Sequence, residues 1–151
     1  IMFGGNVHKT DSLRHTDPWT NYKKNMASYV KETRALGAKP ILFTSLVRRK
    51  FDKNGKLVDT YGEYILAVRA LAKELDVPMI DLYQLSRDLV QKYGPEASKK
   101  LFLYIAPGRF SKLPEGKKDD SHLCAYGAEK VAELAAYEIK KQRLDIASYF
   151  K

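Results

Sequence analysis

Apolar and polar residues alternate along the chain in short blocks, and these blocks predict an α/β order of elements. Apolar residues at helical spacing predict four helices, at about 19–36, 61–75, 82–93 and 125–142. Short apolar runs of strand type occupy 1–3, 39–46 and 77–82. Because strands alternate with helices, we expect a parallel sheet covered by helices on both faces.

Turn and cap residues divide the pattern further. Asp17-Pro18 is a typical helix start, Gly37 ends that helix, and Asn54-Gly55 marks a tight turn. A smaller helix is expected from Glu96 to Leu103, followed by a loop from 106 to 118. No internal repeat, low-complexity segment or domain boundary is visible, so we expect one domain over residues 1–151.

Composition supports a globular protein. The 151 residues are 44% hydrophobic and 30% charged, which is ordinary for a domain that buries a core. No apolar run approaches the roughly 20 residues that a membrane span needs. The single cysteine, Cys124, excludes an internal disulfide and a thiolate-rich zinc site.

The formal net charge of +9 adds three alternatives. The first is a solvated basic surface, the second is attraction to a polyanionic substrate, and the third is nucleic-acid binding. Basic residues are spread along the chain, and no nucleic-acid-binding module accompanies them, so the third is the weakest. Denser groups occur at 48–50, 99–100, 117–118 and 140–141.

The most informative stretch is KDDSHLCAYGA, residues 118–128, where two aspartates precede a histidine. We expect it on a loop at the mouth of the sheet, leading into the last helix, where ligands of such folds bind. A carboxylate beside an imidazole fixes the tautomer and stabilises the imidazolium that forms during proton transfer. Alternatively, Asp119, Asp120 or Ser121 simply caps the helix. The spacing by itself leaves both readings open.

Two short blocks resemble a known family. They are Phe3-Gly4-Gly5-Asn6 and, near the end, Asp119-Asp120-Ser121-His122-Leu123 with Tyr126-Gly127-Ala128. The segments 40–52, 54–55 and 114–117 lie between them in the same order. Together they are similar to the GDSL/SGNH hydrolase superfamily, and within it to the rhamnogalacturonan acetylesterase-like carbohydrate esterases. The resemblance implies a three-layer α/β/α, flavodoxin-like fold with a parallel sheet.

The same resemblance implies roles for individual residues. Asn6 would donate its side-chain amide to an oxyanion hole, and Gly4 or Gly5 would let the backbone approach the site closely. His122 would be the general base that activates a serine, and Asp119 would orient it. Asp120 would then point to solvent or cap the helix. The implied reaction removes O-acetyl groups from a pectic polysaccharide through an acyl-enzyme, without a metal or other cofactor.

The sequence also departs from the family pattern. The family usually has His-Asn-Asp where this chain has Gly5-Asn6-Val7, and the family's Gly-Asp-Ser nucleophile block does not occur in the chain. Ser45 lacks nucleophile-elbow glycines and is a poor substitute. We therefore expect an N-terminally incomplete domain that lacks its first strand and its nucleophile, and that is inactive alone.

Other readings complete the set of expectations. His8 and His15 with Asp11 and Asp17 do not follow a metal-ligand spacing, so we expect no metal site. Cys124 is expected to be a buried small apolar residue. The alternative function is a non-catalytic carbohydrate-binding or interaction protein on the same fold. Expected partners are an acetylated polysaccharide or oligosaccharide, with neither nucleic acid nor membrane, and a secreted or periplasmic location is expected.

Overall fold

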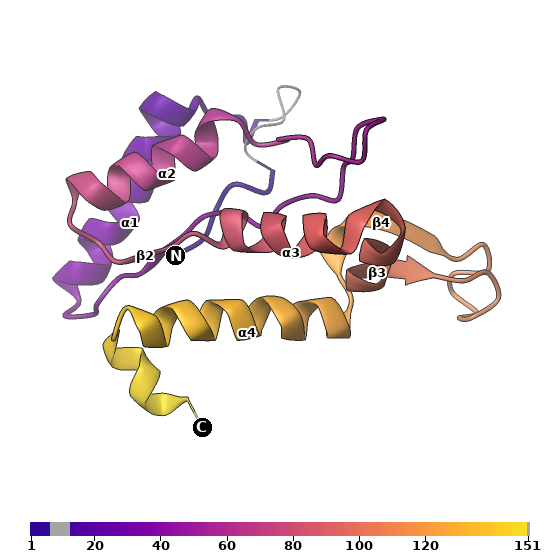
Figure 1. The fold of residues 1–151 in the computed structure, drawn as a ribbon. Helices are drawn as coiled ribbons and strands as arrows, with labels where there is room; N and C mark the ends of the chain where they lie inside the picture. Colours follow the sequence, from indigo (N-terminus) through magenta and orange to yellow (C-terminus); the bar gives the residue numbers. More distant parts are fainter. Residues whose placement is uncertain (7–12, 151) are drawn as a thin grey trace. The chain divides into compact units, whose positions relative to one another are not determined.

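The computed structural model describes residues 1–6 and 13–150. The chain divides into two compact units, and each is described by itself. The first comprises Ile1–Ser45, Tyr61–Tyr83 and Glu138–Lys151, and the second comprises Leu46–Thr60 and Gln84–Tyr137. Figure 1 follows the elements along the chain. The single domain predicted from the sequence stays a prediction.

The first unit contains a short parallel pair of strands. In it β1 (Leu42–Phe43) pairs with β2 (Met79–Ile80), as the alternating pattern predicts. Residues 1–3 form no assigned strand, which corrects that prediction, but Ile1 lies alongside β1. Its amino group donates to the carbonyl of Ile41 at 2.7 Å, and its carbonyl accepts from the amide of Phe43 at 2.9 Å.

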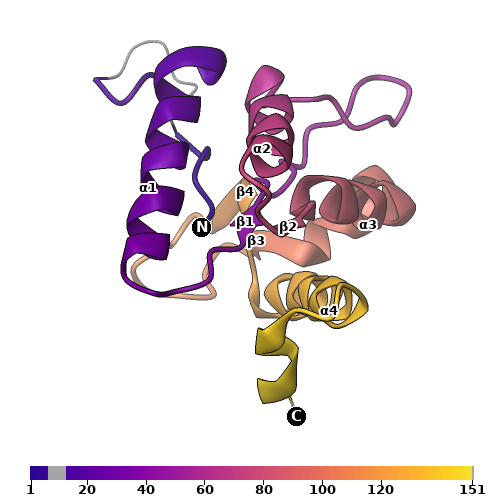
Figure 2. The ribbon, with the colours of Figure 1, turned by 90° about the vertical axis from the view of Figure 1, so that its left-hand side faces the viewer.

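Two helices of the first unit pack together. A turn of π-helix, η1 (Pro18–Tyr22), leads into α1 (Lys23–Ala35), and α2 (Glu63–Glu74) packs against α1 and β1 (Figure 2). The predicted cap is confirmed, because Asp17 Oδ1 accepts from the amides of Trp19 and Thr20 at 3.0 and 2.9 Å. These bonds satisfy amides that a helix start would leave unpaired.

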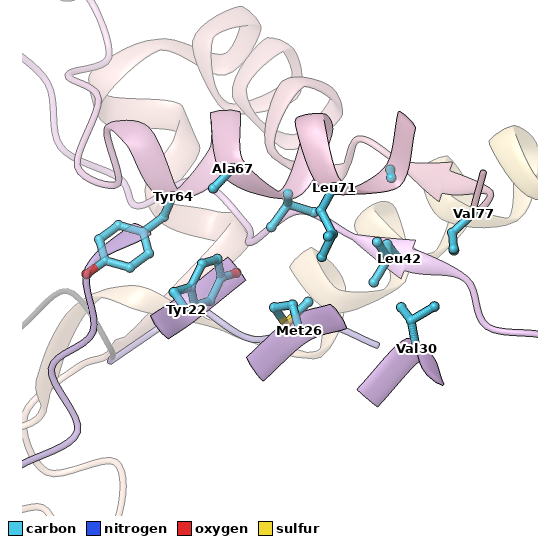
Figure 3. Close-up of a cluster of buried hydrophobic side chains, with 10 residues drawn as sticks. Tyr22, Met26, Val30, Leu42, Tyr64, Ala67, Leu71 and Val77 are labelled. Carbon is cyan, nitrogen blue, oxygen red and sulfur yellow. The ribbon is translucent and has the colours of Figure 1, made fainter. Parts of the chain in front are cut away.

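The apolar faces of these elements form one core. Ring centroids of Tyr22 and Tyr64 lie 5.1 Å apart, with their planes at 74°. Met26 and Val30 from α1 are each 1% exposed, and Leu42 from β1 is fully buried. Figure 3 shows these side chains directed toward Ala67 and Leu71 of α2 and toward Val77. Burial of this face stabilises α1 and α2 more than helix propensity does.

The second unit corrects the sequence prediction in two places. The helix α3 (Leu82–Ala97) is kinked at Gly94, and a short 3₁₀ turn, η2 (Ser98–Leu101), follows it. The small helix predicted over 96–103 is borne out only as far as Leu101: residues 102–105 form β3, antiparallel to β4 (Lys117–Leu123). The Phe-Leu-Tyr-Ile sequence of β3 is rich in residues that favour strands, and its pairing with β4 fixes the extended conformation.

In the second unit, β4 lies between a loop and helix α4 in the sequence. The stretch at 118–123 lies in a strand rather than on a loop, and the preceding loop covers only 106–116. Helix α4 (Ala125–Lys141) follows closely, as predicted. In the segment 46–60, Phe51 bridges Leu57, and Gly55 takes a φ of 72° at the predicted turn.

The chain ends in a short 3₁₀ turn in the first unit, η3 (Asp145–Tyr149), which the sequence pattern does not predict. Across residues 1–6 and 13–150, no helix has both the length and the apolar character needed to cross a membrane.

Candidate active site

The aspartate that faces the histidine is Asp119. Its Oδ2 atom lies 2.8 Å from His122 Nδ1. The Asp119 side chain is 13% exposed, whereas that of His122 is 76% exposed. The predicted choice of Asp119 over Asp120 as the neighbour of the imidazole is confirmed as geometry. An imidazole that is bonded at Nδ1 has its second nitrogen, Nε2, available for proton transfer with a reactant.

A bulge in β4 brings the two side chains together. Phe102 pairs with Leu123 and the next residue, Leu103, pairs with Asp119, so β4 advances four residues where β3 advances one. Residues 120–122 thus have no ladder partner in β3. Bulges of this kind re-aim side chains and are frequent beside active sites. In a regular strand, residues 119 and 122 would point to opposite faces.

The Asp119 carboxylate also closes this bulge. Its Oδ1 accepts from the amides of Ser121 and His122, each at 2.9 Å. Lys117 Nζ lies 3.2 Å from Oδ2. Burial by itself raises the pKa of Asp119, but the two amides, together with His122 and Lys117, lower it further than burial raises it. The net effect holds the pKa well below its ordinary value, so Asp119 is a carboxylate at neutral pH.

Asp120 lies in a separate set of contacts. Its Oδ1 accepts from Arg49 Nη1 and from the Tyr104 hydroxyl, both at 2.6 Å. The prediction that Asp120 points to solvent or caps α4 holds only in part: the side chain is exposed, but it is bonded to Arg49 and Tyr104. Its carboxylate is engaged by a cation that comes from the segment 46–60. Arg49 and Tyr104 have no signal in the local Asp-Asp-x-His spacing, since they are distant from it in sequence.

Close backbone packing fixes the start of α4 behind the bulge. A Cβ atom added to Gly127 would lie 1.9 Å from the carbonyl oxygen of Leu101. The amide of Cys124 donates to the same oxygen at 3.1 Å. Cys124 is half-buried and its Sγ donates to the carbonyl of Lys100 at 3.0 Å, so it is a polar contact rather than the buried apolar residue expected.

Asn6 lies in the first unit, at the end of a turn. The Tyr22 hydroxyl donates to the carbonyl of Phe3 at 2.8 Å, and burial raises the pKa of Tyr22 to about 12. Gly4 has a φ of 143°, and a Cβ there would lie 2.5 Å from Ser45 Oγ. Gly4 thus packs closely against Ser45, whereas the close approach of Gly4 or Gly5 to the site stays a prediction. Asn6 itself is exposed.

Ser45 and the possible metal ligands are the remaining candidates from the sequence. Ser45 is 6% exposed, and its hydroxyl donates to the carbonyl of Phe3 at 3.4 Å. The metal alternative rests partly on His8 and Asp11, which lie outside the described residues. The described structure thus brings Asp119 and His122 together in one unit and holds Asn6 in the other. Their joint role stays a prediction.

Two curated proteins of Bacillus subtilis (strain 168) match almost the whole chain. Rhamnogalacturonan acetylesterase RhgT is 40% identical over 149 residues, 99% of this chain and 63% of the relative. The probable rhamnogalacturonan acetylesterase YesY is 31% identical over 147 residues, 97% of this chain and 63% of the relative. Over nearly all of its residues the chain is thus similar to rhamnogalacturonan acetylesterases. It spans less than two thirds of the length of these two relatives.

Solved structures support the SGNH fold. A crystal structure of protein YXIM from Bacillus subtilis, 26% identical, matches with a TM-score of 0.74 over 95% of this chain and 36% of that chain. A variant of Axe2, an acetyl-xylooligosaccharide esterase from Geobacillus, is 19% identical, with a TM-score of 0.61 over 91% of this chain and 57% of that chain. The predicted SGNH-type α/β fold is thus confirmed. A scan against protein-family models gave no match.

Proposed function

We propose that this chain contributes the base and oxyanion residues of a carbohydrate esterase that removes O-acetyl groups from a pectic, rhamnogalacturonan-like polysaccharide. The single observation that carries the proposal is the 2.8 Å contact between Asp119 Oδ2 and His122 Nδ1. The two curated relatives support it, since one is a rhamnogalacturonan acetylesterase and the other a probable one.

The proposed reaction is acyl transfer through a serine. His122 Nε2 takes the proton of the serine hydroxyl while the serine oxygen attacks the acetyl carbonyl. Asn6 donates its side-chain amide to the oxyanion that forms, and such a donor contributes about 3 kcal/mol in known cases. The imidazolium then protonates the sugar oxygen as its bond to the acetyl carbon breaks, so that the sugar leaves with a free hydroxyl. Water, activated by the same imidazole, releases acetate and restores the serine.

Asp119 has a defined part in this mechanism. Its carboxylate accepts the Nδ1 proton, so the neutral imidazole offers Nε2 as the base. The lowered pKa of Asp119 keeps that carboxylate charged, and the charge stabilises the imidazolium between the two proton transfers. The amides of Ser121 and His122 fix the carboxylate before substrate binds, which limits reorganisation during the reaction.

The serine of this mechanism belongs to the family's Gly-Asp-Ser block, which the 151 residues do not contain. The proposal therefore includes little or no hydrolysis by residues 1–151 alone. An incomplete triad retains only about a thousandfold advantage over water. The formal charge of +9 suits an anionic pectic substrate, and a polymer of this kind favours a secreted or periplasmic location.

The experiment compares residues 1–151 with the longest product of the gene that contains them. Acetate release from acetylated rhamnogalacturonan and hydrolysis of an aryl acetate are measured for both. We expect activity in the longer product, loss of it in His122→Ala, and a decrease of about 10⁴-fold in Asp119→Asn. His15→Ala is the matched control, because His15 is an exposed histidine of the first unit.

The design separates the outcomes. Full activity in His122→Ala would contradict the assigned base, and equal release of acetate from xylan would contradict the pectic substrate. Turnover by residues 1–151 that disappears in Ser45→Ala would assign a different nucleophile.

A further inference from the structure

Arg49, which lies outside the β3–β4 pair, holds the bulge of β4. The amide of Arg49 donates to the carbonyl of Asp120 at 2.8 Å, which gives this bulge carbonyl the partner that β3 does not supply. The guanidinium of the same residue lies on the Asp120 side chain, with Nη1 and Oδ1 separated by 2.6 Å. Arg49 therefore binds both the backbone and the side chain of the residue next to Asp119.

The Arg49 guanidinium is itself closely surrounded. Its side chain is 9% exposed. Nε donates to Ser98 Oγ at 3.0 Å, Nη1 to the Tyr104 hydroxyl at 3.0 Å, and Nη2 to the carbonyl of Pro95. Its central carbon also lies 5.4 Å from the ring centroid of Tyr104. Such a fork of planar donors selects arginine, because a lysine ammonium cannot satisfy the same acceptors at once.

Tyr104 completes this arrangement from β3. Its hydroxyl donates to Asp120 Oδ1, the atom that also accepts from Arg49. Burial, together with this hydrogen bond, raises the pKa of Tyr104 and keeps the phenol a donor. The negative charge of Asp120 is thus balanced by the Arg49 guanidinium, and Arg49 and Tyr104 both donate to the same carboxylate oxygen. The Asp120 side chain is nevertheless 49% exposed.

Asp120 is adjacent to Asp119 in sequence, so an unpaired Asp120 carboxylate could compete with Asp119 for the imidazole of His122. A carboxylate at 120 that lost Arg49 would be one residue from Asp119 and in the same bulge as His122. Two carboxylates compete for one imidazole, and a released bulge can take several shapes because β3 does not pair with it. The imidazole would then no longer be confined to one hydrogen-bond partner and one tautomer.

We propose that Arg49 is a positioning residue of the candidate active site: it holds the bulge in the shape that brings His122 onto Asp119, and it keeps Asp120 away from the imidazole. The proposal rests on the proposed function for its catalytic meaning, but its structural content does not require hydrolysis. Arg49 acts through Asp120 and touches neither Asp119 nor His122 in the contacts described above.

The test measures the tautomer of His122 directly. Imidazole ¹⁵N chemical shifts of labelled residues 1–151 report the ratio of Nδ1–H to Nε2–H forms above the pH at which the ring is protonated. In Arg49→Met, we expect this ratio to fall about tenfold, the size of one lost charge-assisted hydrogen bond. In the longest gene product, kcat for an aryl acetate should fall about tenfold to a hundredfold with little change in KM.

Arg69→Met is the matched control. Arg69 also pairs with an aspartate, since its Nη2 and Asp81 Oδ2 are 2.8 Å apart, but this pair belongs to the first unit. We expect it to lower stability without moving the His122 tautomer ratio. An equal change in Arg69→Met and Arg49→Met would overturn the proposal, because the change would then report general destabilisation.

Milder variants keep the test decisive if Arg49→Met does not fold. Tyr104→Phe removes one donor to Asp120, and we expect a smaller change of the ratio in the same direction. Arg49→Lys should restore part of the wild-type ratio. An unchanged ratio in folded Arg49→Met, or in Tyr104→Phe where Arg49→Met is unfolded, would refute the proposal. An enzyme without esterase activity, but with these tautomer changes, would refute only the proposed function.

Discussion

The turn that carries Asn6 and the bulge that carries His122 are shaped by opposite means. In the turn, Gly4 meets Ser45 so closely that an added Cβ would lie 2.5 Å from the serine oxygen. In the bulge, side-chain oxygens of Asp119 and Asp120 hold the backbone and its neighbours. The shape of the turn thus depends on the absence of a side chain at Gly4, and the shape of the bulge depends on hydrogen bonds to two carboxylates.

The difference has physical consequences. A shape that depends on close packing does not titrate, but it tolerates no added atom, because protein interiors are dense. A shape that depends on hydrogen bonds to carboxylates weakens with acid, yet it tolerates replacements that keep the bonds. The proposed mechanism places proton transfer at the bulge, where Asp119 both accepts from the bulge amides and contacts the imidazole of His122.

The largest expected effect follows from closing the space at the turn. Gly4→Ala adds a methyl group against Ser45 Oγ at a φ of 143°, a backbone conformation that side chains rarely adopt. Strain of this type costs about 1–3 kcal/mol, and a clash adds to it. We expect a loss of about 2–4 kcal/mol in the free energy of unfolding, measured by urea denaturation.

Two further variants separate strain from clash. Gly5→Ala is the control, because no heavy atom lies within 4 Å of a Cβ added there, and its effect should stay below about 0.5 kcal/mol. Combining Gly4→Ala with Ser45→Gly should restore the part of the stability that is lost to the clash. The part that is lost to backbone strain should remain. Equal losses in the single and double variants would show that the contact with Ser45 is unimportant.

A smaller effect, dependent on pH, is expected at the bulge. The pKa of Asp119 is lowered in the folded protein, so its contribution is present above the unfolded value of about 4 and is lost as the pH falls below it. Asp119→Asn should cost about 1–2 kcal/mol at pH 7 and progressively less as the pH falls below 4. Urea unfolding from pH 7 to pH 2.5 measures this convergence.

The control for this prediction is Asp88→Asn. Asp88 accepts from the side-chain amide of Gln84 at 2.8 Å on the exposed face of α3. We expect Asp88→Asn to have a small effect at pH 7, because its carboxylate accepts from an exposed side chain and from no backbone amide in the bonds described. A constant difference between wild type and Asp119→Asn across this range would contradict the role given to the Asp119 carboxylate.

Sequence reasoning predicts the regular parts of this molecule and part of the site. Helical spacing indicates α1, α2 and α4, because apolar residues at that spacing must face a core. The Asp-x-x-His pair is also visible, since both residues lie within one short block. The family resemblance, rather than the spacing, selects Asp119 over Asp120.

The remaining features depend on contacts between distant segments. The strand character of 102–105 comes from pairing with β4, and a propensity pattern that is ambiguous over so few residues cannot predict it. The bulge follows from a change of register, which local composition does not encode. Arg49 reads as one of three consecutive basic residues, and only its contacts with Ser98, Tyr104 and Asp120 distinguish it.

The smallest effect is expected where the turn depends on a polar atom at all. The Ser45 hydroxyl donates to the Phe3 carbonyl over a long 3.4 Å, and that carbonyl already accepts from Tyr22 at 2.8 Å. Ser45→Ala should therefore change the free energy of unfolding by less than about 0.5 kcal/mol.

Ser98→Ala is the comparison in the second unit. Ser98 is fully buried and accepts from Arg49 Nε at 3.0 Å, so its loss leaves a buried cation short of a partner and should cost about 1–3 kcal/mol. Urea denaturation measures both variants. A larger loss in Ser45→Ala than in Ser98→Ala would reverse the distinction between a turn shaped by packing and a bulge shaped by hydrogen bonds.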